Sequence, residues 1–258
     1  MMKKIILLPS LVVIFILKFI NTSMAECRYP PCKKLESVGT CGEGCTYTYD
    51  QSAQTVYISS AGNDSKMAYA AFRPGSYENN YLPHLNYIID GPISIGDNAF
   101  TDNYETISGA NGTLILTGIN HHGFGDNATL SGNIVIPANA TFGSLAFHGV
   151  TLADGAKIYC AVENCAQKMI DSCKAWGDET NKYRVRCLNA AQTIISDEDK
   201  FEQAPEGCDF WSATGCSKCT NSNYSLEYGY CYRKRYTIQE ADAATSDDNE
   251  NMIEWIFE

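Results

Sequence analysis

The chain has 258 residues, a formal net charge of -11 at pH 7, 12 cysteines and 20 glycines. This length is sufficient for a hydrophobic core in one domain that carries an appendage. The acidic balance argues against nucleic acids and anionic membrane surfaces as partners, because both carry negative charge themselves.

The pattern of residues 1–25 is typical of a secretory signal peptide. Lys3 and Lys4 provide the positive n-region, Ile5 to Leu17 the apolar h-region, and Ser23-Met24-Ala25 a small-residue cleavage site. We therefore predict cleavage after Ala25, a secreted or cell-surface protein, and no membrane insertion after cleavage. A retained anchor is the alternative, but the apolar run is shorter than the roughly 20 residues of a spanning helix. Cleavage removes three lysines and no acidic residue, which changes the net charge from -11 to -14.

The cysteines all follow the predicted cleavage site and form three groups of four. An even number in an exported chain predicts a disulfide framework rather than reactive thiols. Because each group can close internally, the disulfide candidates are Cys27, Cys32, Cys41 and Cys45; Cys160, Cys165, Cys173 and Cys187; and Cys208, Cys216, Cys219 and Cys231. The long segment between the first two groups has no cysteine and needs another source of stability.

That cysteine-free segment contains a repeated pattern. The sequence "GDNAF" (Gly96–Phe100) has echoes in "GDNA" (Gly125–Ala128) and "GSLAF" (Gly143–Phe147). Short β-type runs separate them and recur at intervals of 27, 20 and 23 residues: Tyr87–Ile89, Leu114–Leu116, Ile134–Ile136 and Lys157–Cys160. Such spacing predicts a solenoid in which each coil contributes a short strand and a turn. The expected repeat core is Ile88, Ile95, Ala99, Phe100, Ile115, Val135, Phe147 and Ile158, with Ile88, Ile115, Val135 and Ile158 on adjacent parallel strands.

The sequence "ISIGDNAF" (Ile93–Phe100) resembles the core of the BspA-type leucine-rich repeat. The segment Cys41–Asp64, with paired cysteines, an aromatic-rich strand and a return strand "YISSAG", is similar to the hairpin that precedes such repeats. The resemblance covers about residues 41–160, and the unit around Gly125 has Thr129 in place of the aromatic residue. It implies an exported recognition or adhesion protein with a protein or glycan ligand.

The predicted fold is mainly β: a short leucine-rich-repeat-like β-solenoid with a cap at each end and a small cysteine-rich module. We place the N-terminal disulfide and hairpin cap at 26–83, the solenoid at 84–160, a disulfide-bonded helical cap at 161–190, and the C-terminal module with its acidic tail at 191–258. A helix over 162–176 puts Cys165, Met169 and Cys173 on one face. That face can bond to Cys160 and to Cys187, at the end of a predicted strand "KYRVRC".

The C-terminal module has four cysteines whose spacing is also compatible with a zinc ribbon. In an exported protein we favour disulfides, because an oxidising compartment removes the thiolates that zinc needs. The arrangement "GCxxC…GYCY" resembles small cysteine-rich repeats of extracellular surface proteins. For the tail 236–258 we predict a strand, a short helix at 240–244, an acidic loop at 246–251 and a final strand at 253–257.

The sequence carries no recognised catalytic motif, and we predict neither enzyme activity nor a cofactor. It lacks G-x-S-x-G, H-E-x-x-H, Walker and Rossmann patterns. The histidines are His84, His121, His122 and His148; because adjacent strand residues point to opposite faces, we predict surface or turn histidines rather than a metal site. Asp97, Asp126 and Asp154 recur in turns, where backbone hydrogen bonding explains them better than calcium.

Two groups of residues leave alternatives open. The aromatic residues of the first third serve either a binding platform or scaffold packing: Tyr47, Tyr49, Tyr57, Tyr69, Phe72, Tyr77, Tyr81 and Tyr87. The sequons at Asn63, Asn111, Asn127, Asn139 and Asn223 mark either glycosylated surface positions or turn asparagines. The predicted function is non-catalytic recognition or adhesion. The alternatives are a secreted enzyme or enzyme inhibitor without a recognisable motif, and a structural surface-layer component.

Overall fold

The computed structural model describes residues 35–73, 85–100, 106–174 and 181–234, and within these ranges it is mainly β. The strands of the first half are β1 (Val38–Glu43), β2 (Cys45–Asp50), β3 (Thr55–Ser60), β4 (Lys66–Met67), β5 (Asn86–Asp90), β6 (Ile93–Ile95), β7 (Thr106–Ile119) and β8 (Thr129–Ile136). The second half contains β9 (Thr141–Phe142), β10 (Thr151–Leu152), β11 (Lys157–Cys160), α2 (Cys165–Lys174), α3 (Lys182–Ile195), β12 (Phe201–Gln203), β13 (Cys208–Ser212), β14 (Gly215–Cys219), β15 (Tyr224–Glu227) and β16 (Tyr230–Arg233).

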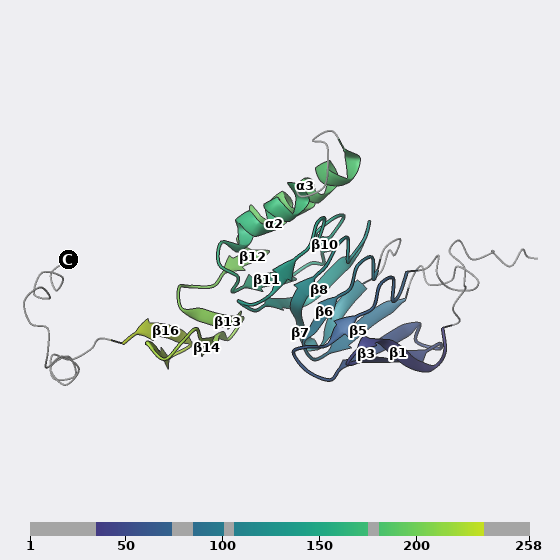
Figure 1. Ribbon diagram of the computed structural model, residues 1–258, viewed down its shortest axis with the longest axis horizontal. Helices are drawn as coiled ribbons and strands as arrows, with labels where there is room; N and C mark the ends of the chain where they lie inside the picture. Colours follow the sequence, from purple (N-terminus) through teal and green to yellow (C-terminus); the bar gives the residue numbers. More distant parts are fainter. Residues whose placement is uncertain (1–34, 74–84, 101–105, 175–180, 235–258) are drawn as a thin grey trace, which may run out of the picture.

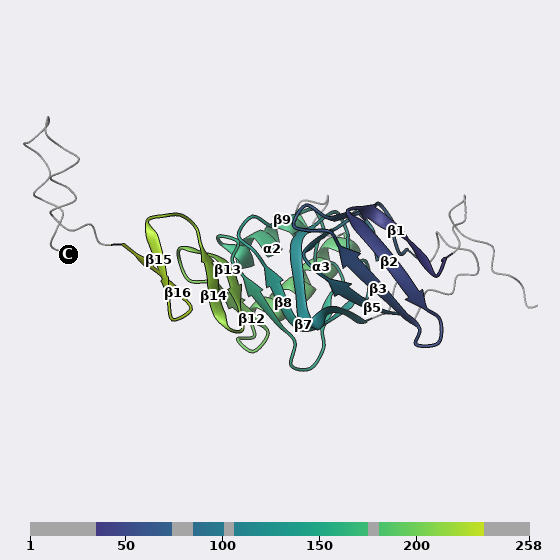
Figure 2. The same ribbon diagram turned by 90° about the horizontal axis from the view of Figure 1, so that it is seen from below.

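The main sheet begins antiparallel and continues as a parallel stack. Strands β1, β2 and β3 pair antiparallel, whereas β3, β5, β7, β8, β11 and β12 follow one another in parallel. Each coil therefore returns the chain to the same direction, which is the solenoid-like arrangement that the repeat predicts. Figures 1 and 2 show this stack with β1 at one end and the β13–β16 hairpins beyond the other.

The prediction of adjacent parallel strands is confirmed, because β5, β7, β8 and β11 carry Ile88, Ile115, Val135 and Ile158 in that order. The four residues themselves do not all pair with one another. Ile115 pairs with Val135, and Ile134 pairs with Ile158, all in parallel. Ile88 instead pairs with Ser108. The reason is a bend in β7 between Ser108 and Thr113, where Asn111 and Gly112 have positive φ. Because of this bend, the first half of β7 pairs with β5 and the second half with β6.

The solenoid interior is filled by alternate strand residues and by residues of the turns. Ile95, Ala99, Phe100, Phe147 and Ile158 are all fully buried in the interior cluster.

Three other expected core residues do not belong to this interior. Ile88 and Ile115 are only half-buried, because their neighbours on each side are the residues that point inward. Val135 is fully buried but lies outside the interior cluster, in register with Ile115 on one side and Tyr159 on the other. These residues belong to the outer face of the sheet.

A ladder of aromatic rings runs through the turns. Phe72 stacks on Phe100 at a centroid distance of 5.7 Å, and Phe100 stacks on Phe124 at 6.2 Å. Phe124 closes the segment "NHHGF" (Asn120–Phe124), which aligns with Gly96–Phe100 because Ile95 pairs with Ile119. The assignment of Gly125–Ala128 to this repeat unit was therefore wrong. The third unit keeps its aromatic residue and replaces the Asp-Asn step by two histidines.

The turn of each unit contains one residue in the left-handed region. These residues are Ala70 (φ 51°), Asn98 (φ 52°), His122 (φ 51°) and Leu145 (φ 57°). Backbone hydrogen bonds join successive turns, as from Asn98 N to His121 O at 2.9 Å and from His122 N to Ser144 O at 3.0 Å. The turns thus stack as regularly as the strands do.

The disulfides pair within the cysteine groups as expected. Among the described residues they are Cys41–Cys45, Cys160–Cys165, Cys173–Cys187, Cys208–Cys216 and Cys219–Cys231. The module cysteines are therefore disulfide-bonded rather than zinc ligands. Cys27, Cys32, the predicted signal peptide, His84, Tyr77, Tyr81 and the acidic tail lie outside the described residues. No helix among the described residues has the length and apolar character needed to cross a membrane.

One predicted element has the wrong secondary structure. The segment "KYRVRC" begins α3 rather than forming a strand, and the Asn181 side chain accepts a hydrogen bond from Tyr183 N at the helix start. Cys187, Ala191 and Ile194 follow at helical spacing and form the buried face. α2 contacts α3 and β9, and α3 also contacts β10 and β12. The two helices therefore pack against the later coils of the solenoid (Figure 1).

Candidate functional site

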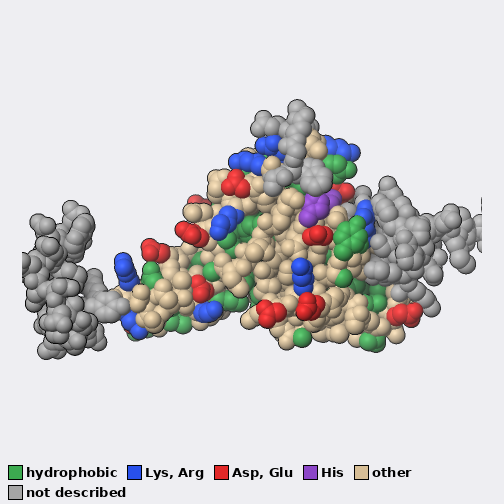
Figure 3. All heavy atoms as spheres, in the orientation of Figure 1, with side chains coloured by type: hydrophobic (Ala, Val, Ile, Leu, Met, Phe, Trp, Pro, Cys, Tyr) green, Lys and Arg blue, Asp and Glu red, His purple; other side chains and the backbone are tan. Residues whose placement is uncertain are grey.

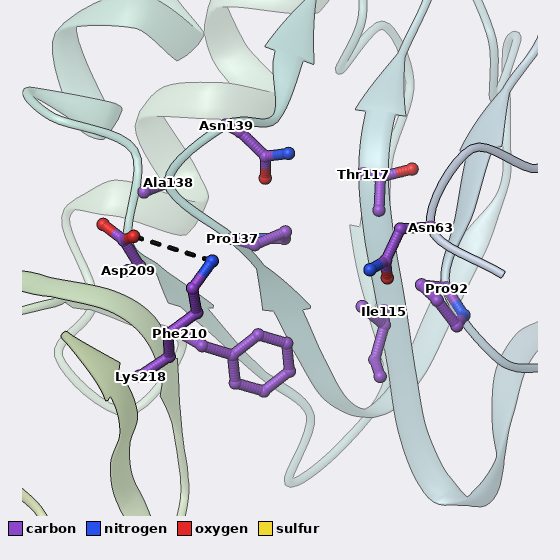
Figure 4. Close-up of a pocket in the computed structure, with 10 residues that line it drawn as sticks. All are labelled: Asn63, Pro92, Ile115, Thr117, Pro137, Ala138, Asn139, Asp209, Phe210 and Lys218. Atoms are coloured by element: carbon purple, nitrogen blue, oxygen red, sulfur yellow. Dashed lines mark ion pairs between the residues drawn. The ribbon is translucent and has the colours of Figure 1, made fainter. Parts of the chain in front are cut away.

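A cleft of about 410 Å³ lies between the outer face of the solenoid and the first hairpin of the C-terminal module. The module is fixed there by a hydrogen bond from Ala138 N to Asp209 O at 2.9 Å and by contacts of β13 with β8 and β11. The indole of Trp211 donates to Glu202 at 2.9 Å, and Glu202 forms an ion pair with Lys157 at 2.8 Å. Two parts of the chain that are distant in sequence therefore share the cleft (Figure 4).

The walls of the cleft combine an aromatic ring with several polar groups. The lining residues are Asn63, Pro92, Ile115, Thr117, Pro137, Ala138, Asn139, Asp209, Phe210 and Lys218. Figure 4 shows the Phe210 ring between the module and the solenoid strands, Asn63 and Thr117 on the opposite side, and Asn139 above, on the loop that carries Ala138. Lys218 Nζ lies 3.9 Å from Asp209 Oδ2. Both charges are near the surface, and they contribute polarity to the site more than stability.

One polar group in this wall has no internal partner. Thr117 Oγ1 is buried and makes no hydrogen bond within the described part of the chain. An unpaired buried hydroxyl destabilises a fold by about 1–3 kcal/mol.

A second polar site lies at the turns of the third and fourth coils. His122 Nε2 is 2.9 Å from His148 Nδ1, and His148 Nδ1 is 3.1 Å from Asp126 Oδ1. His148 is 1% exposed, and His122 is buried as well. Both histidines lie in turns, which agrees with the prediction of surface or turn histidines, and both are buried. Histidine side chains gather at one place on the face shown in Figure 3.

The left-handed turn separates the adjacent histidines. The His121 ring contacts Ser144 Oγ through Nδ1 at 2.6 Å, whereas the His122 ring contacts Asn98 Oδ1 through Nδ1 at 3.3 Å. The two rings thus have different partners. His122 finds its histidine partner 26 residues away instead of next to it.

Helix α3 encloses the second site from outside. Arg186 donates to Asp126 O at 2.6 Å and to Asn127 Oδ1, and its Nη1 lies 3.5 Å from Asp126 Oδ1. The Tyr183 ring lies 5.4 Å from that of His148, between ring centroids. Burial lowers the pKa of His148, and the Asp126 carboxylate opposes this effect only in part. The His148 imidazole is therefore neutral near pH 7.

The remaining candidate residues are dispersed. Asp97 Oδ1 accepts a hydrogen bond from His121 N at 3.1 Å, which is the backbone role predicted for a turn aspartate, and Asp154 is exposed in another turn. Only Asp126 of the three joins a polar cluster in the described residues. Tyr47, Phe72 and Tyr87 pack in the core, whereas Tyr57 and Tyr69 are 42% and 65% exposed.

Sequence reasoning missed both sites. The cleft could have been suspected from "NIVIP" (Asn133–Pro137), whose continuous apolar run is typical of a strand covered on both faces. The meeting of His122 and His148 had no local signal, because it depends on the stacking of two coils. No protein-family model, curated protein or solved structure matches the chain.

Proposed function

We propose that the protein is an exported, non-catalytic recognition protein that binds a glycan in the cleft between solenoid and module. The observation that carries this proposal is the cleft itself. Its volume lies in the range of about 300–1,000 Å³ that is typical of small-ligand sites. It combines an apolar floor with a few polar groups that can fix the orientation of a ligand.

The chemistry of the walls favours a sugar. A pyranose ring presents an apolar face of C–H groups, which stacks on an aromatic ring, and an edge of hydroxyls, which bind amides and carboxylates. Phe210 supplies the aromatic face, while Asn63, Asn139 and Asp209 supply the hydrogen-bonding groups. A nucleic acid ligand would be repelled by the acidic chain.

Export and the leucine-rich-repeat-like description are parts of the same proposal. Five disulfides among the described residues favour an oxidising compartment, in agreement with the signal-peptide pattern of residues 1–25. The stacked Phe72, Phe100 and Phe124 turns support a repeat scaffold. In this proposal β1–β2 and the helices α2 and α3 act as its caps, because they contact the first and last coils.

The test is a glycan array probed with residues 26–258, followed by calorimetry with the best ligand. The protein is produced without N-glycosylation, because Asn63 and Asn139 lie both in sequons and in the cleft. Phe210→Leu keeps apolar bulk but removes the aromatic face, and we expect about a 3- to 10-fold loss of affinity. We expect a similar loss from Asn139→Ala, which removes one hydrogen bond.

Tyr228→Leu is the matched control, because Tyr228 is 96% exposed and does not line the cleft. It should leave the affinity unchanged. The proposal fails if no glycan binds, or if Phe210→Leu binds its glycan as well as the wild type does. If the protein bound a peptide and no glycan, the proposal of a glycan ligand would be wrong and a peptide would take its place.

A further inference from the structure

The cluster of His122, Asp126 and His148 is not explained by the cleft, which lies on another part of the molecule. It combines two imidazoles and one carboxylate from two successive coils. His122 occupies the left-handed position of the third turn, Asp126 follows Phe124 by two residues, and His148 directly follows Phe147. The stacked turns of the third and fourth coils, joined by the hydrogen bond from His122 N to Ser144 O, therefore bring the three side chains together. We propose that these three residues bind one divalent late transition metal ion, for which Cu²⁺ is the best match.

The three donor atoms have the separations that one such ion needs. They are 2.9 Å between His122 Nε2 and His148 Nδ1, 3.1 Å between His148 Nδ1 and Asp126 Oδ1, and 4.0 Å between His122 Nε2 and Asp126 Oδ1. These separations leave a point about 2.0 Å from all three atoms, which matches metal–nitrogen and metal–oxygen bonds of about 2.0–2.2 Å. The separations of the three donor atoms therefore already suit one ion, which would replace the hydrogen bond between the two imidazoles.

The shape of this triangle favours copper. Seen from the central point, the two shorter separations subtend about 90–100°, and His122 Nε2 and Asp126 Oδ1 lie nearly opposite each other. Three donors in one plane with such angles are part of a square-planar arrangement, which Cu²⁺ prefers for nitrogen and oxygen ligands. Tetrahedral Zn²⁺ would require the two opposite donors to approach each other, so it should bind more weakly.

Several polar groups around the donors attract a cation, whereas the Arg186 guanidinium, 3.5 Å from Asp126 Oδ1, repels it. The carbonyl of Gly125 lies 3.4 Å from His148 Nδ1, so a carboxylate, a carbonyl and two imidazole nitrogens share a small space. The polar contacts of His148 are made through Nδ1. Metal binding there places the ring proton on Nε2, which is buried without a partner in the described residues, and this costs part of the binding free energy. Asn98 contacts the second nitrogen of His122, which is the contact that orients a metal-binding imidazole. On the α3 side the cluster is bordered by the Arg186 guanidinium and the Tyr183 ring, and the Asp126 side chain is 27% exposed.

The test is a Cu²⁺ titration of the EDTA-treated protein, residues 26–258, at pH 7.4 against a competing chelator. Electron paramagnetic resonance of the loaded protein then counts nitrogen ligands. We expect one Cu²⁺ per chain with two imidazole nitrogens and tighter binding than for Zn²⁺. His122→Asn, in which Asn tolerates the left-handed backbone, should weaken binding at least 30-fold. Circular dichroism checks that each variant is folded.

His121→Asn is the matched control, because His121 bonds Ser144 Oγ through Nδ1 and is not one of the three donors, although its ring lies 6.1 Å from that of His122. It should bind Cu²⁺ as the wild type does. Arg186→Gln should bind several-fold more tightly, because it removes a cation that lies 3.5 Å from the Asp126 carboxylate. Equal affinity of His122→Asn and wild type, or no binding of Cu²⁺ by the folded wild type, would show that the cluster is only a hydrogen-bonded network and would overturn the proposal. Because the cleft variants are separate residues, this result leaves the glycan proposal untouched.

Discussion

Replacement of Phe100 by alanine measures how much the aromatic ladder contributes to stability. Phe100 is fully buried, and its ring lies 5.7 Å from Phe72, 5.0 Å from Tyr87 and 6.2 Å from Phe124. A buried Phe→Ala change costs about 3–5 kcal/mol. Because three ring pairs are lost, and each contributes about 0.5–1.5 kcal/mol beyond area burial, we expect a loss near 5 kcal/mol. Phe100→Asp should prevent folding of the solenoid, since it buries an unpaired charge.

The assay is guanidinium unfolding of the oxidised protein, followed by far-ultraviolet circular dichroism. Asp97→Ala is the reference, because the exposed Asp97 carboxylate makes one hydrogen bond, to His121 N, and its loss should cost about 1 kcal/mol or less. The ladder argument would be refuted if Phe100→Ala lost less than 2 kcal/mol, or no more than Asp97→Ala.

Two further predictions concern the helices and the first hairpin. Replacing Cys173 and Cys187 together by alanine should lower the free energy of unfolding by about 3 kcal/mol, and replacing Cys41 and Cys45 together should lower it by about 2 kcal/mol. The difference is expected because a disulfide that closes a longer loop removes more entropy from the unfolded chain. Equal losses would contradict this explanation. Burial raises the pKa of Tyr47 above its ordinary value of 10.0. The contribution of the neutral Tyr47 phenol to the free energy of unfolding is therefore complete below pH 10 and is lost as the pH rises through the raised pKa. Tyr47→Phe should therefore lose less stability than wild type between pH 9 and pH 11, and equal losses in unfolding titrations would exclude this role.

The local features of the fold could be predicted because they depend on short-range geometry. Cys160 and Cys165 are five residues apart, and Cys173 lies on the same helical face as Cys165, so little choice of partners remained. The turn at Gly96–Phe100 was likewise predictable. A Cβ on Gly96 would lie 2.3 Å from Met67 O, which explains why this turn position contains glycine.

The register of the third coil could not be predicted, because its best sequence match is a false one. Gly125–Ala128 repeats the letters of Gly96–Ala99, but the coil places Asn120–Phe124 at that position. The bend in β7 shifts the two halves of the coil relative to a regular repeat. Similarly, "KYRVRC" shows strand-like alternation over six residues, and only the buried positions further along α3 reveal a helix.

The positions that differ most between coils are those that carry the chemistry. Backbone hydrogen bonds and the phenylalanine ladder determine the shape of each turn, so the side chain at the left-handed position is free to vary from Asn98 to His122 to Leu145. A residue whose side chain contributes little to the turn can be exchanged for function at small cost in stability. For this reason the departure from the repeat at His121-His122, rather than the best-matching unit at Gly96–Phe100, indicates where a ligand is bound. Stability and metal affinity should then respond to different substitutions, with Phe100 controlling the first and His122 the second.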